Sequence, residues 1–257
     1  MTPLPASNRA ASTPAASTPD AAGSPDYAGY AAWRAWDEGA FMALSPAEAS
    51  YYATELRGLD LAAKPVLELG FGNGGFLAFA KQQGAILYGS ELQPDLAALG
   101  AAAGVTLVDP DLAKLLPDHA AKFALVAAFD VFEHIDLAEL PRLLATIAEL
   151  LIDGGLLIAR YPNGQSPFGR VHQHGDITHR AVLSADIMRQ LVAPLPFDIV
   201  HLGNQASPAG LVQRARTLLQ RAHEIALQRL YGHDTPLGPN SVAVLRKRAS
   251  THPHIQQ

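Results

Sequence analysis

The chain has 257 residues, of which 49% are hydrophobic and 17% charged, and this suits one α/β domain with a sizeable core. Its net charge of −5 excludes the basic balance that is typical of general nucleic-acid binders. The lack of cysteine excludes a disulfide framework, a thiolate metal site and a cysteine nucleophile, and it is compatible with the cytoplasmic location that we expect.

Residues 1–25 are rich in Ala, Ser, Thr and Pro and are predicted to be a disordered tail. They lack the apolar segment of a signal peptide, and no later stretch reaches the roughly 18 apolar residues that span a bilayer. Residues 26–62 are predicted to form a helical cover with aromatic side chains, including Trp33 and Trp36, at helical spacing. We interpret this cover as packed on the sheet rather than as a lid over a ligand.

Residues 63–248 are predicted to form the main domain, in which apolar strands alternate with helices. Strands are expected at 65–69, 85–90, 105–108, 123–129, 155–161, 197–202 and 241–246. Helices are expected at 74–83, 94–102, 111–117, 137–152, 184–193 and 208–231. Asp153-Gly154-Gly155 is expected to end the helix at 137–152 and to lead into the next strand. Repeated βα units predict a mostly parallel sheet with helices on both faces, and residues 249–257 are expected to be a tail.

The first strand runs into glycines at positions 70, 72, 74 and 75, followed by a helical pattern. A strand that turns through glycines into a helix brings backbone N–H groups close to a ligand. Glu91 ends the second strand 21 residues after Gly70, about the distance at which an acid reaches the ribose of a nucleoside cofactor. The sequence therefore predicts an adenosine-containing ligand.

The glycines alone also match a dinucleotide fingerprint, so an NAD-dependent oxidoreductase is an alternative. Glu68 favours a different cofactor, because a carboxylate beside the glycines suits the free ammonium group of a sulfonium cofactor and gains nothing beside a pyrophosphate. Asp111 follows the third strand, where it can accept a hydrogen bond from an adenine amino group. The run Asp130-Val-Phe-Glu133-His134 follows the fourth strand, at the sheet edge where open α/β sheets bind ligands.

In this order, the motifs resemble those of the class I S-adenosylmethionine-dependent methyltransferases. The resemblance implies a Rossmann-like, mostly parallel seven-stranded sheet and S-adenosyl-L-methionine as the cofactor. The cofactor contacts that it implies are Glu68, Gly70, Phe71, Gly72, Gly74, Glu91, Leu92, Asp111, Leu112, Asp130 and Glu133. The chain departs from the family pattern because the helix at 208–231 separates the last two strands, which usually form a hairpin.

The segment 162–183 is predicted to bind the methyl acceptor, because it is long, lacks a clear period and is rich in polar residues. In one interpretation an imidazole is the general base: His174 or His179, oriented by Asp176, or else His134 at the end of the fourth strand. In the other, the loop histidines and Asp176 bind a divalent ion. The loop spacing matches no strong metal motif, so no metal site is predicted.

The same loop resembles that of a bacterial subset of these enzymes that often accompanies surface-polysaccharide synthesis. This resemblance implies methyl transfer to a polar small molecule or carbohydrate, at a hydroxyl oxygen. Two alternatives stay open: N-methylation of a small metabolite, and a catalytically silent scaffold subunit that binds the cofactor.

The helix at 208–231 has one apolar face, with arginines largely outside it. Such a helix is compatible with peripheral contact with a membrane surface or with binding of a phosphorylated or lipid-linked acceptor. We interpret it instead as packed on the domain or on the second subunit of a homodimer, with its arginines in water.

Overall fold

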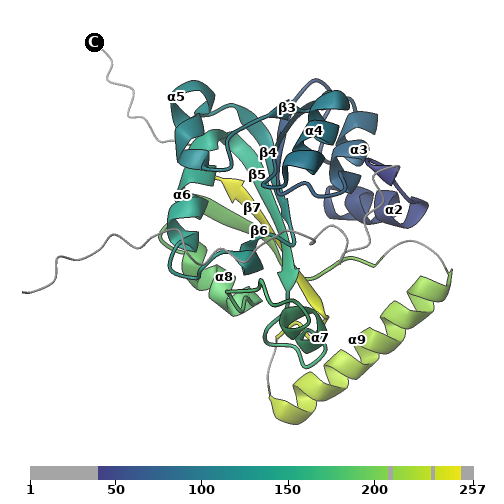
Figure 1. Ribbon diagram of the computed structural model, residues 1–257. Helices are drawn as coiled ribbons and strands as arrows, with labels where there is room; N and C mark the ends of the chain where they lie inside the picture. Colours follow the sequence, from purple (N-terminus) through teal and green to yellow (C-terminus); the bar gives the residue numbers. More distant parts are fainter. Residues whose placement is uncertain (1–39, 208–210, 233–234, 250–257) are drawn as a thin grey trace, which may run out of the picture.

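The computed structural model describes residues 40–207, 211–232 and 235–249 (Figure 1). Seven strands form one sheet in the order β3-β2-β1-β4-β5-β7-β6. Their bounds are β1 Pro65–Leu69, β2 Ile86–Ser90, β3 Thr106–Leu107, β4 Phe123–Phe129, β5 Leu151–Pro162, β6 Phe197–Asn204 and β7 Asn240–Lys247. Strand β7 is antiparallel to both of its neighbours, and the other pairs are parallel. The predicted mostly parallel seven-stranded sheet is confirmed.

The predicted terminal tails lie outside the described residues, apart from Ala249. The part of the predicted cover that includes Trp33 and Trp36 also lies outside them.

Helices cover both faces of the sheet (Figure 1). On one side lie α2 (Pro46–Glu55), α3 (Gly75–Gln82) and α4 (Pro94–Ala102). On the other lie α5 (Leu116–His119), α6 (Leu140–Leu150) and α8 (Ala185–Val192). Because side chains alternate along a strand, Leu67 and Leu69 of β1 enter the core beside α6, while Val66 enters the core beside α3. The buried carboxyl group of Glu68 follows the alternation of Val66.

Helix α6 has an apolar face that buries Leu140, Leu144 and Ile147 completely. The helix ends at Leu150, so the expected end at 152 is wrong. Leu151 already has extended backbone angles and pairs with Phe123 of β4.

The segment Asp153-Gly154-Gly155 therefore lies inside β5 instead of ending the helix. The register between β4 and β5 shifts at this point, and Gly154 has a φ of +78°. Glycine tolerates the positive φ that this irregular pairing requires, so the sequence signal marked a bulge rather than a helix end.

The described part of the cover consists mainly of α2, which begins with a capping box between Ser45 and Glu48. The ring of Tyr52 on this helix lies 5.4 Å from that of Phe76 and 5.2 Å from that of Phe129, measured between centroids. The described helix α2 therefore packs on the sheet and its helices, while the cover over residues 26–62 as a whole stays a prediction.

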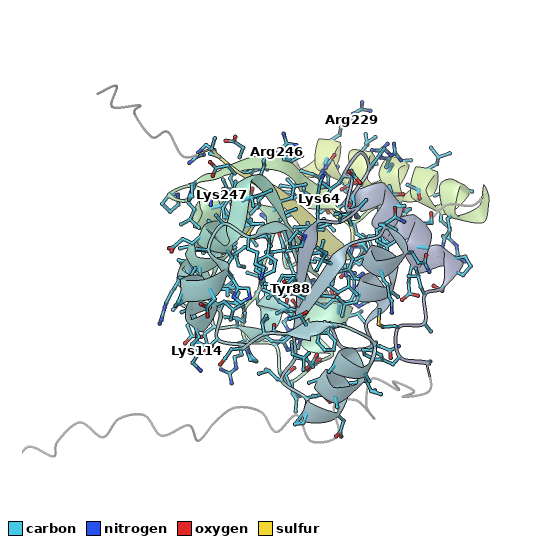
Figure 2. The ribbon with its side chains drawn as sticks, turned by 90° about the horizontal axis from the view of Figure 1, so that it is seen from above. Lys64, Tyr88, Lys114, Arg229, Arg246 and Lys247 are labelled. Carbon is cyan, nitrogen blue, oxygen red and sulfur yellow. The ribbon has the colours of Figure 1, made fainter. Side chains whose placement is uncertain are left out.

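Helix α9 (Leu211–Tyr231) lies apart from the helices that cover the sheet (Figure 1). Its Glu224 accepts a hydrogen bond from Asn204 Nδ2 on β6 at 2.9 Å, but Leu218, Leu219 and Leu230 are 68%, 73% and 73% exposed. Arg229 points outward from the helix (Figure 2). Within the described part of the chain, the domain therefore leaves much of the apolar face of α9 uncovered. Its contact with a second subunit or a membrane surface stays a prediction.

Among the described residues, none of the helices has the length and apolar character needed to cross a membrane. The cytoplasmic location stays a prediction.

Candidate functional site

A glycine turn connects β1 to α3. Gly70, Gly72 and Gly74 have φ values of +56°, +49° and +72°, which residues other than glycine rarely adopt. A Cβ at Gly74 would also lie only 2.8 Å from Met42 Cγ. Glycine is therefore required for the turn that brings the N-terminus of α3 to the sheet edge.

A cavity of about 450 Å³ opens beside this turn, which is within the usual size range of small-molecule sites. Most of the predicted cofactor residues line it: Glu68, Gly70, Phe71, Gly72, Glu91, Leu92, Leu112 and Asp130. The cover also contributes Glu48 and Tyr52 to its wall.

Three predicted cofactor residues, Gly74, Asp111 and Glu133, are not part of the cavity wall. Gly74 belongs to the turn itself, and Glu133 is buried next to His134, which does line the cavity. Asp111 instead caps the short helix η2 (Leu112–Leu115), because its carboxylate accepts a hydrogen bond from Ala113 N at 3.3 Å. Its side chain is 55% exposed.

Glu68 is a buried acid in the wall of the cavity, with only 4% of its surface exposed. Burial raises the pKa of its carboxyl group well above the ordinary value. Its Oε2 atom is buried without a hydrogen-bond partner, which is costly for a polar atom. A ligand ammonium group would provide the missing donor and the compensating charge, so this part of the cavity fits the amino-acid end of S-adenosylmethionine.

Glu91 stabilises the part of the cavity wall that the glycine turn forms. Its carboxylate accepts hydrogen bonds from the backbone N–H groups of Gly72, Leu92 and Gln93 at 2.9, 2.8 and 3.0 Å. It thereby connects the end of β2 to the glycine turn. A carboxylate offers about four acceptor positions, so one remains for a ligand hydroxyl group.

Asp130 and Arg160 form an ion pair at the carboxyl end of β4 and β5, and both line the cavity. Arg160 Nε donates to Asp130 Oδ1 at 2.9 Å, and the guanidinium carbon lies 5.5 Å from the ring centroids of Tyr51 and Phe129. Asp130 has a φ of +57°, which the pairing helps to hold. Arg160 was not among the predicted site residues, although an arginine at the end of an otherwise apolar strand is a usable signal.

The loop after β5 is anchored at its start by polar contacts with the segment before β7. Asn163 Nδ2 donates to Pro236 O and Gly238 O at 2.8 and 3.1 Å, and Ser166 Oγ donates to Leu237 O at 2.6 Å. Both side chains are buried. These two polar residues of the predicted acceptor loop therefore shape it.

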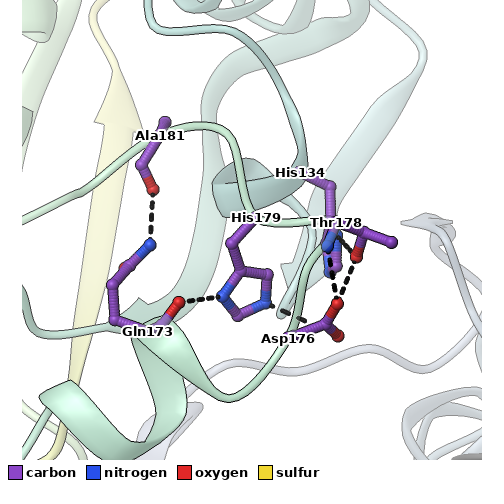
Figure 3. Close-up of polar contacts among 6 residues, drawn as sticks. All are labelled: His134, Gln173, Asp176, Thr178, His179 and Ala181. Atoms are coloured by element: carbon purple, nitrogen blue, oxygen red, sulfur yellow. Dashed lines mark hydrogen bonds and ion pairs between the residues drawn. The ribbon is translucent and has the colours of Figure 1, made fainter. Parts of the chain in front are cut away.

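Further along the loop, a hydrogen-bonded chain reaches the end of β4 (Figure 3). The hydroxyl group of Thr178 donates to Asp176 Oδ1 at 2.6 Å, and the backbone N–H of Thr178 donates to the same atom at 2.9 Å. The Thr178 oxygen lies 2.8 Å from His134 Nδ1. Because the hydroxyl proton is used toward the carboxylate, Nδ1 of His134 is the donor in this contact.

The electrostatics of this chain keep Asp176 charged and His134 neutral near pH 7. Burial lowers the pKa of His134, and the neighbouring His179 lowers it further. Burial alone would raise the pKa of Asp176, but the hydrogen bonds from Thr178 outweigh this effect and hold it below the ordinary value. His134 also lines the cavity, so it joins the loop to the cofactor side of the site.

His179 lies against His134, with a distance of 4.7 Å between the ring centroids (Figure 3). Its Nδ1 lies 3.0 Å from the carbonyl oxygen of Gln173, which fixes Nδ1 as the donor. Its Nε2 lies 3.8 Å from Asp176 Oδ2. The structure thus brings together three of the four predicted catalytic candidates, His134, Asp176 and His179.

The fourth candidate, His174, is exposed at the end of α7 (Arg170–His174) and does not belong to this cluster. His172 on the same helix is also exposed. Thr178 and Gln173 were not predicted, although they hold the two imidazoles. A threonine two residues after an aspartate is the signature of a local side-chain turn that could have indicated Thr178.

A family model described as a methyltransferase domain matches residues 46–202, which is more than half of the chain. No curated protein sequence matches the chain.

Solved structures of methyltransferases resemble this fold at low sequence identity. A SAM-dependent methyltransferase from Archaeoglobus fulgidus is 16% identical, with a TM-score of 0.62 over 87% of this chain and 100% of that one. The 1,6-didemethyltoxoflavin-N1-methyltransferase of Burkholderia thailandensis, with bound S-adenosylhomocysteine, is 18% identical, with a TM-score of 0.54 over 87% and 84%. The magnesium protoporphyrin IX methyltransferase of Synechocystis, with the same bound product, is 15% identical, with a TM-score of 0.52 over 78% and 80%.

Proposed function

The chain belongs to the methyltransferase-domain family as an S-adenosylmethionine-dependent methyltransferase, and from this premise we propose that it methylates a hydroxyl oxygen of a polar small molecule or carbohydrate. The observation that carries the proposal is the chain of contacts from Asp176 through Thr178 to His134, which ends in the wall of the cofactor cavity. A hydroxyl acceptor must lose a proton when it is methylated, and these contacts orient the imidazole of His134 at the carboxyl edge of the sheet, where the cavity lies.

On the cofactor side, each residue has a role that its surroundings support. When bound, S-adenosylmethionine supplies an electrophilic methyl group, whose carbon moves from the sulfur to the acceptor oxygen while the sulfur keeps the electron pair of the broken bond. Glu68 binds the ammonium group of the amino-acid end, and Glu91 accepts a hydrogen bond from a ribose hydroxyl. Leu112 packs on the adenine side, while Gly70 and Gly72 allow close approach of the backbone.

On the acceptor side, the proposal assigns to His134 the removal of the hydroxyl proton. Its Nδ1–H is donated to Thr178, so Nε2 is the ring nitrogen that accepts the proton. The charge that then develops on the imidazole is stabilised by Asp176 through the Thr178 hydroxyl group. General-base catalysis of this kind contributes about 10²- to 10⁴-fold to the rate.

The acceptor class is supported by the exposed polar side chains of the loop. Arg170, His172 and His174 are exposed along α7, while Asn163 and Ser166 fix the loop beneath them. Dense hydrogen bonding from such a surface suits the hydroxyl groups of a sugar. The loop sequence also resembles the methyltransferase subset that accompanies surface-polysaccharide synthesis, and we extend the proposal to that class of acceptor.

The experiment has two stages. Calorimetric titration with S-adenosylhomocysteine and with NAD should detect binding of the thioether only. A panel of sugar and amine acceptors is then tested for S-adenosylhomocysteine production, with His134→Gln as the variant and His201→Gln, an exposed imidazole on β6, as the matched control.

We expect turnover of hydroxyl acceptors that falls about 10²- to 10⁴-fold in His134→Gln and stays unchanged in His201→Gln. Turnover of amines alone, insensitive to His134→Gln, would replace the proposal with N-methylation, because a neutral amine needs no base. Tight binding of the thioether without turnover of any acceptor would instead favour the silent scaffold.

A further inference from the structure

Three potential metal ligands converge where the acceptor loop meets the end of β4. One ligand atom from each of Glu133, His134 and His179 lies within 4.8 Å of the other two. Glu133 and His134 belong to the short helix η3 (Phe132–His134), whereas His179 comes from the loop after β5. The backbone fixes this meeting, because Glu133 O accepts hydrogen bonds from the N–H groups of Arg180 at 2.7 Å and Ala181 at 3.0 Å.

Both imidazoles have the tautomer that metal binding requires. Nδ1–H of His179 is committed to the Gln173 carbonyl group, and Nδ1–H of His134 is committed to Thr178. Nε2 is therefore the atom of each ring with a lone pair to offer. Histidines that bind metals almost always donate the other ring N–H to a carbonyl, a carboxylate or a similar acceptor, and this outer contact fixes the ring orientation.

The charge around the cluster favours a cation. The side chains of His179 and Asp176 are each only 8% exposed, and Glu133 is 1% exposed. His179 Nε2 lies 3.8 Å from Asp176 Oδ2, too far for a hydrogen bond. Two imidazoles and two carboxylates therefore lie together in a largely buried place, and together they form a set of nitrogen and oxygen donors that suits a divalent cation.

We propose that Glu133, His134 and His179 bind a divalent first-row transition-metal ion, such as Mn²⁺ or Zn²⁺, at the acceptor end of the cofactor cavity. The inference rests on the proposed function and specifies how the acceptor hydroxyl is activated. Two imidazoles and one carboxylate suit such ions better than Mg²⁺ or Ca²⁺, which prefer oxygen ligands.

The geometry requires only a small adjustment. Bonds of about 2.1 Å to a tetrahedral ion would separate the ligand atoms by about 3.4 Å, so atoms that now lie within 4.8 Å of one another must approach by at most about 1.4 Å. Three protein ligands leave an open position, as in catalytic metal sites. Because His134 also lines the cavity, that position can face an acceptor bound beside the methyl group.

In this arrangement the ion takes over the role of the base. A hydroxyl group bound to a divalent ion is strongly acidified, so its proton can leave to water before the oxygen attacks the methyl carbon. His134 then acts as a ligand, and Thr178 and Gln173 become the positioning residues behind the two imidazoles.

The test measures ion binding by the full chain separately from catalysis. Protein stripped with a chelator is titrated with Mn²⁺, and the electron paramagnetic resonance signal of free Mn²⁺ reports the bound fraction. We expect one site per chain, weakened at least about 100-fold by His134→Gln or His179→Gln and about 10-fold by Thr178→Val, because outer contacts typically contribute 10- to 100-fold. His201→Gln should bind Mn²⁺ like the wild type, and a parallel calorimetric titration with Zn²⁺ should give the same pattern.

Lack of stoichiometric binding of both ions, or binding that neither ligand variant weakens in folded protein, would overturn the inference. Hydroxyl methylation that is equally fast in stripped and Mn²⁺-loaded enzyme would also overturn it, while the proposed function would stand with His134 as the base. If Mn²⁺ binds as expected but only amines are methylated, the metal site is supported and the proposed hydroxyl chemistry fails.

Discussion

The most direct test of the cofactor geometry is the substitution Glu91→Gln. In the structure three backbone N–H groups, from Gly72, Leu92 and Gln93, donate to the two carboxylate oxygens. An amide keeps only one acceptor oxygen and turns its NH₂ group toward N–H donors. The substitution therefore affects both the predicted ribose contact and the glycine turn to which Glu91 is bonded.

The magnitude follows from these contacts. One hydrogen bond to a charged group contributes about 1.5–3 kcal/mol, so the loss of the ribose contact alone should weaken binding about 10- to 150-fold. The assay is calorimetric titration with S-adenosylhomocysteine, with Asp95→Asn as the control, because Asp95 is an exposed acid of α4 outside the cavity wall. Thermal unfolding of both variants checks that they are folded. Affinity within threefold of the wild type in folded Glu91→Gln would refute this role.

Three further predictions concern charge and packing. Burial raises the pKa of Glu68, and the ammonium group of the ligand requires the carboxylate form, so binding of S-adenosylhomocysteine should release a proton and become tighter as the pH rises toward that pKa. Calorimetry over a pH series should find that this pH dependence of the affinity is reduced in Glu68→Gln. An unchanged pH dependence would contradict the contact between Glu68 and the ammonium group. Arg160→Met removes the partner of Asp130 and should lower the free energy of unfolding in urea by about 1–3 kcal/mol, and no loss would mean that the pair is unimportant for folding. Leu144→Ala creates a cavity in the core under α6 and should cost about 2–5 kcal/mol in the same assay, whereas the 44% exposed Leu137 should tolerate alanine at much lower cost.

The strands were predictable because their signal is local. The runs at 65–69 and 123–129 are apolar, bounded by polar or glycine residues, and the structure reproduces both ranges. The bulge at Asp153-Gly154-Gly155 was not predictable, because the sequence Asp-Gly-Gly is equally typical of a helix end and of a bulge with a positive φ inside a strand. Only the register between β4 and β5 distinguishes the two, and register is a tertiary property.

The surface that covers the apolar face of α9 was not predictable for a related reason. Its apolar residues, such as Leu218 and Leu230, follow a helical period that predicts a buried face, but periodicity does not identify the surface that buries it. In the structure Glu224 connects the helix to Asn204, and these leucines are left exposed.

Most of the predicted cofactor residues line one cavity because each lies within a few residues of a strand end, so sequence order gives their place at the sheet edge. The cluster around His134 is different, since its partners come from a loop with no period. The sequence placed His174 and His179 on equal terms, and only the path of the loop separates an exposed imidazole from a buried one.

The path of the loop also explains how one site can separate acceptor binding from acceptor activation. Glu133 O accepts hydrogen bonds from the N–H groups of Arg180 and Ala181 and so holds the end of the loop. Glu133 directly precedes His134, and Arg180 directly follows His179. The separation of the two imidazoles is therefore set by backbone bonds and does not depend on the side chains that line the outer part of the loop. Substitutions at exposed positions such as Arg170 can then change which acceptor is bound while the activating cluster and the cofactor cavity stay intact. Acceptor specificity in this fold should accordingly reside in α7 and its flanks, and activation should reside where β4 ends.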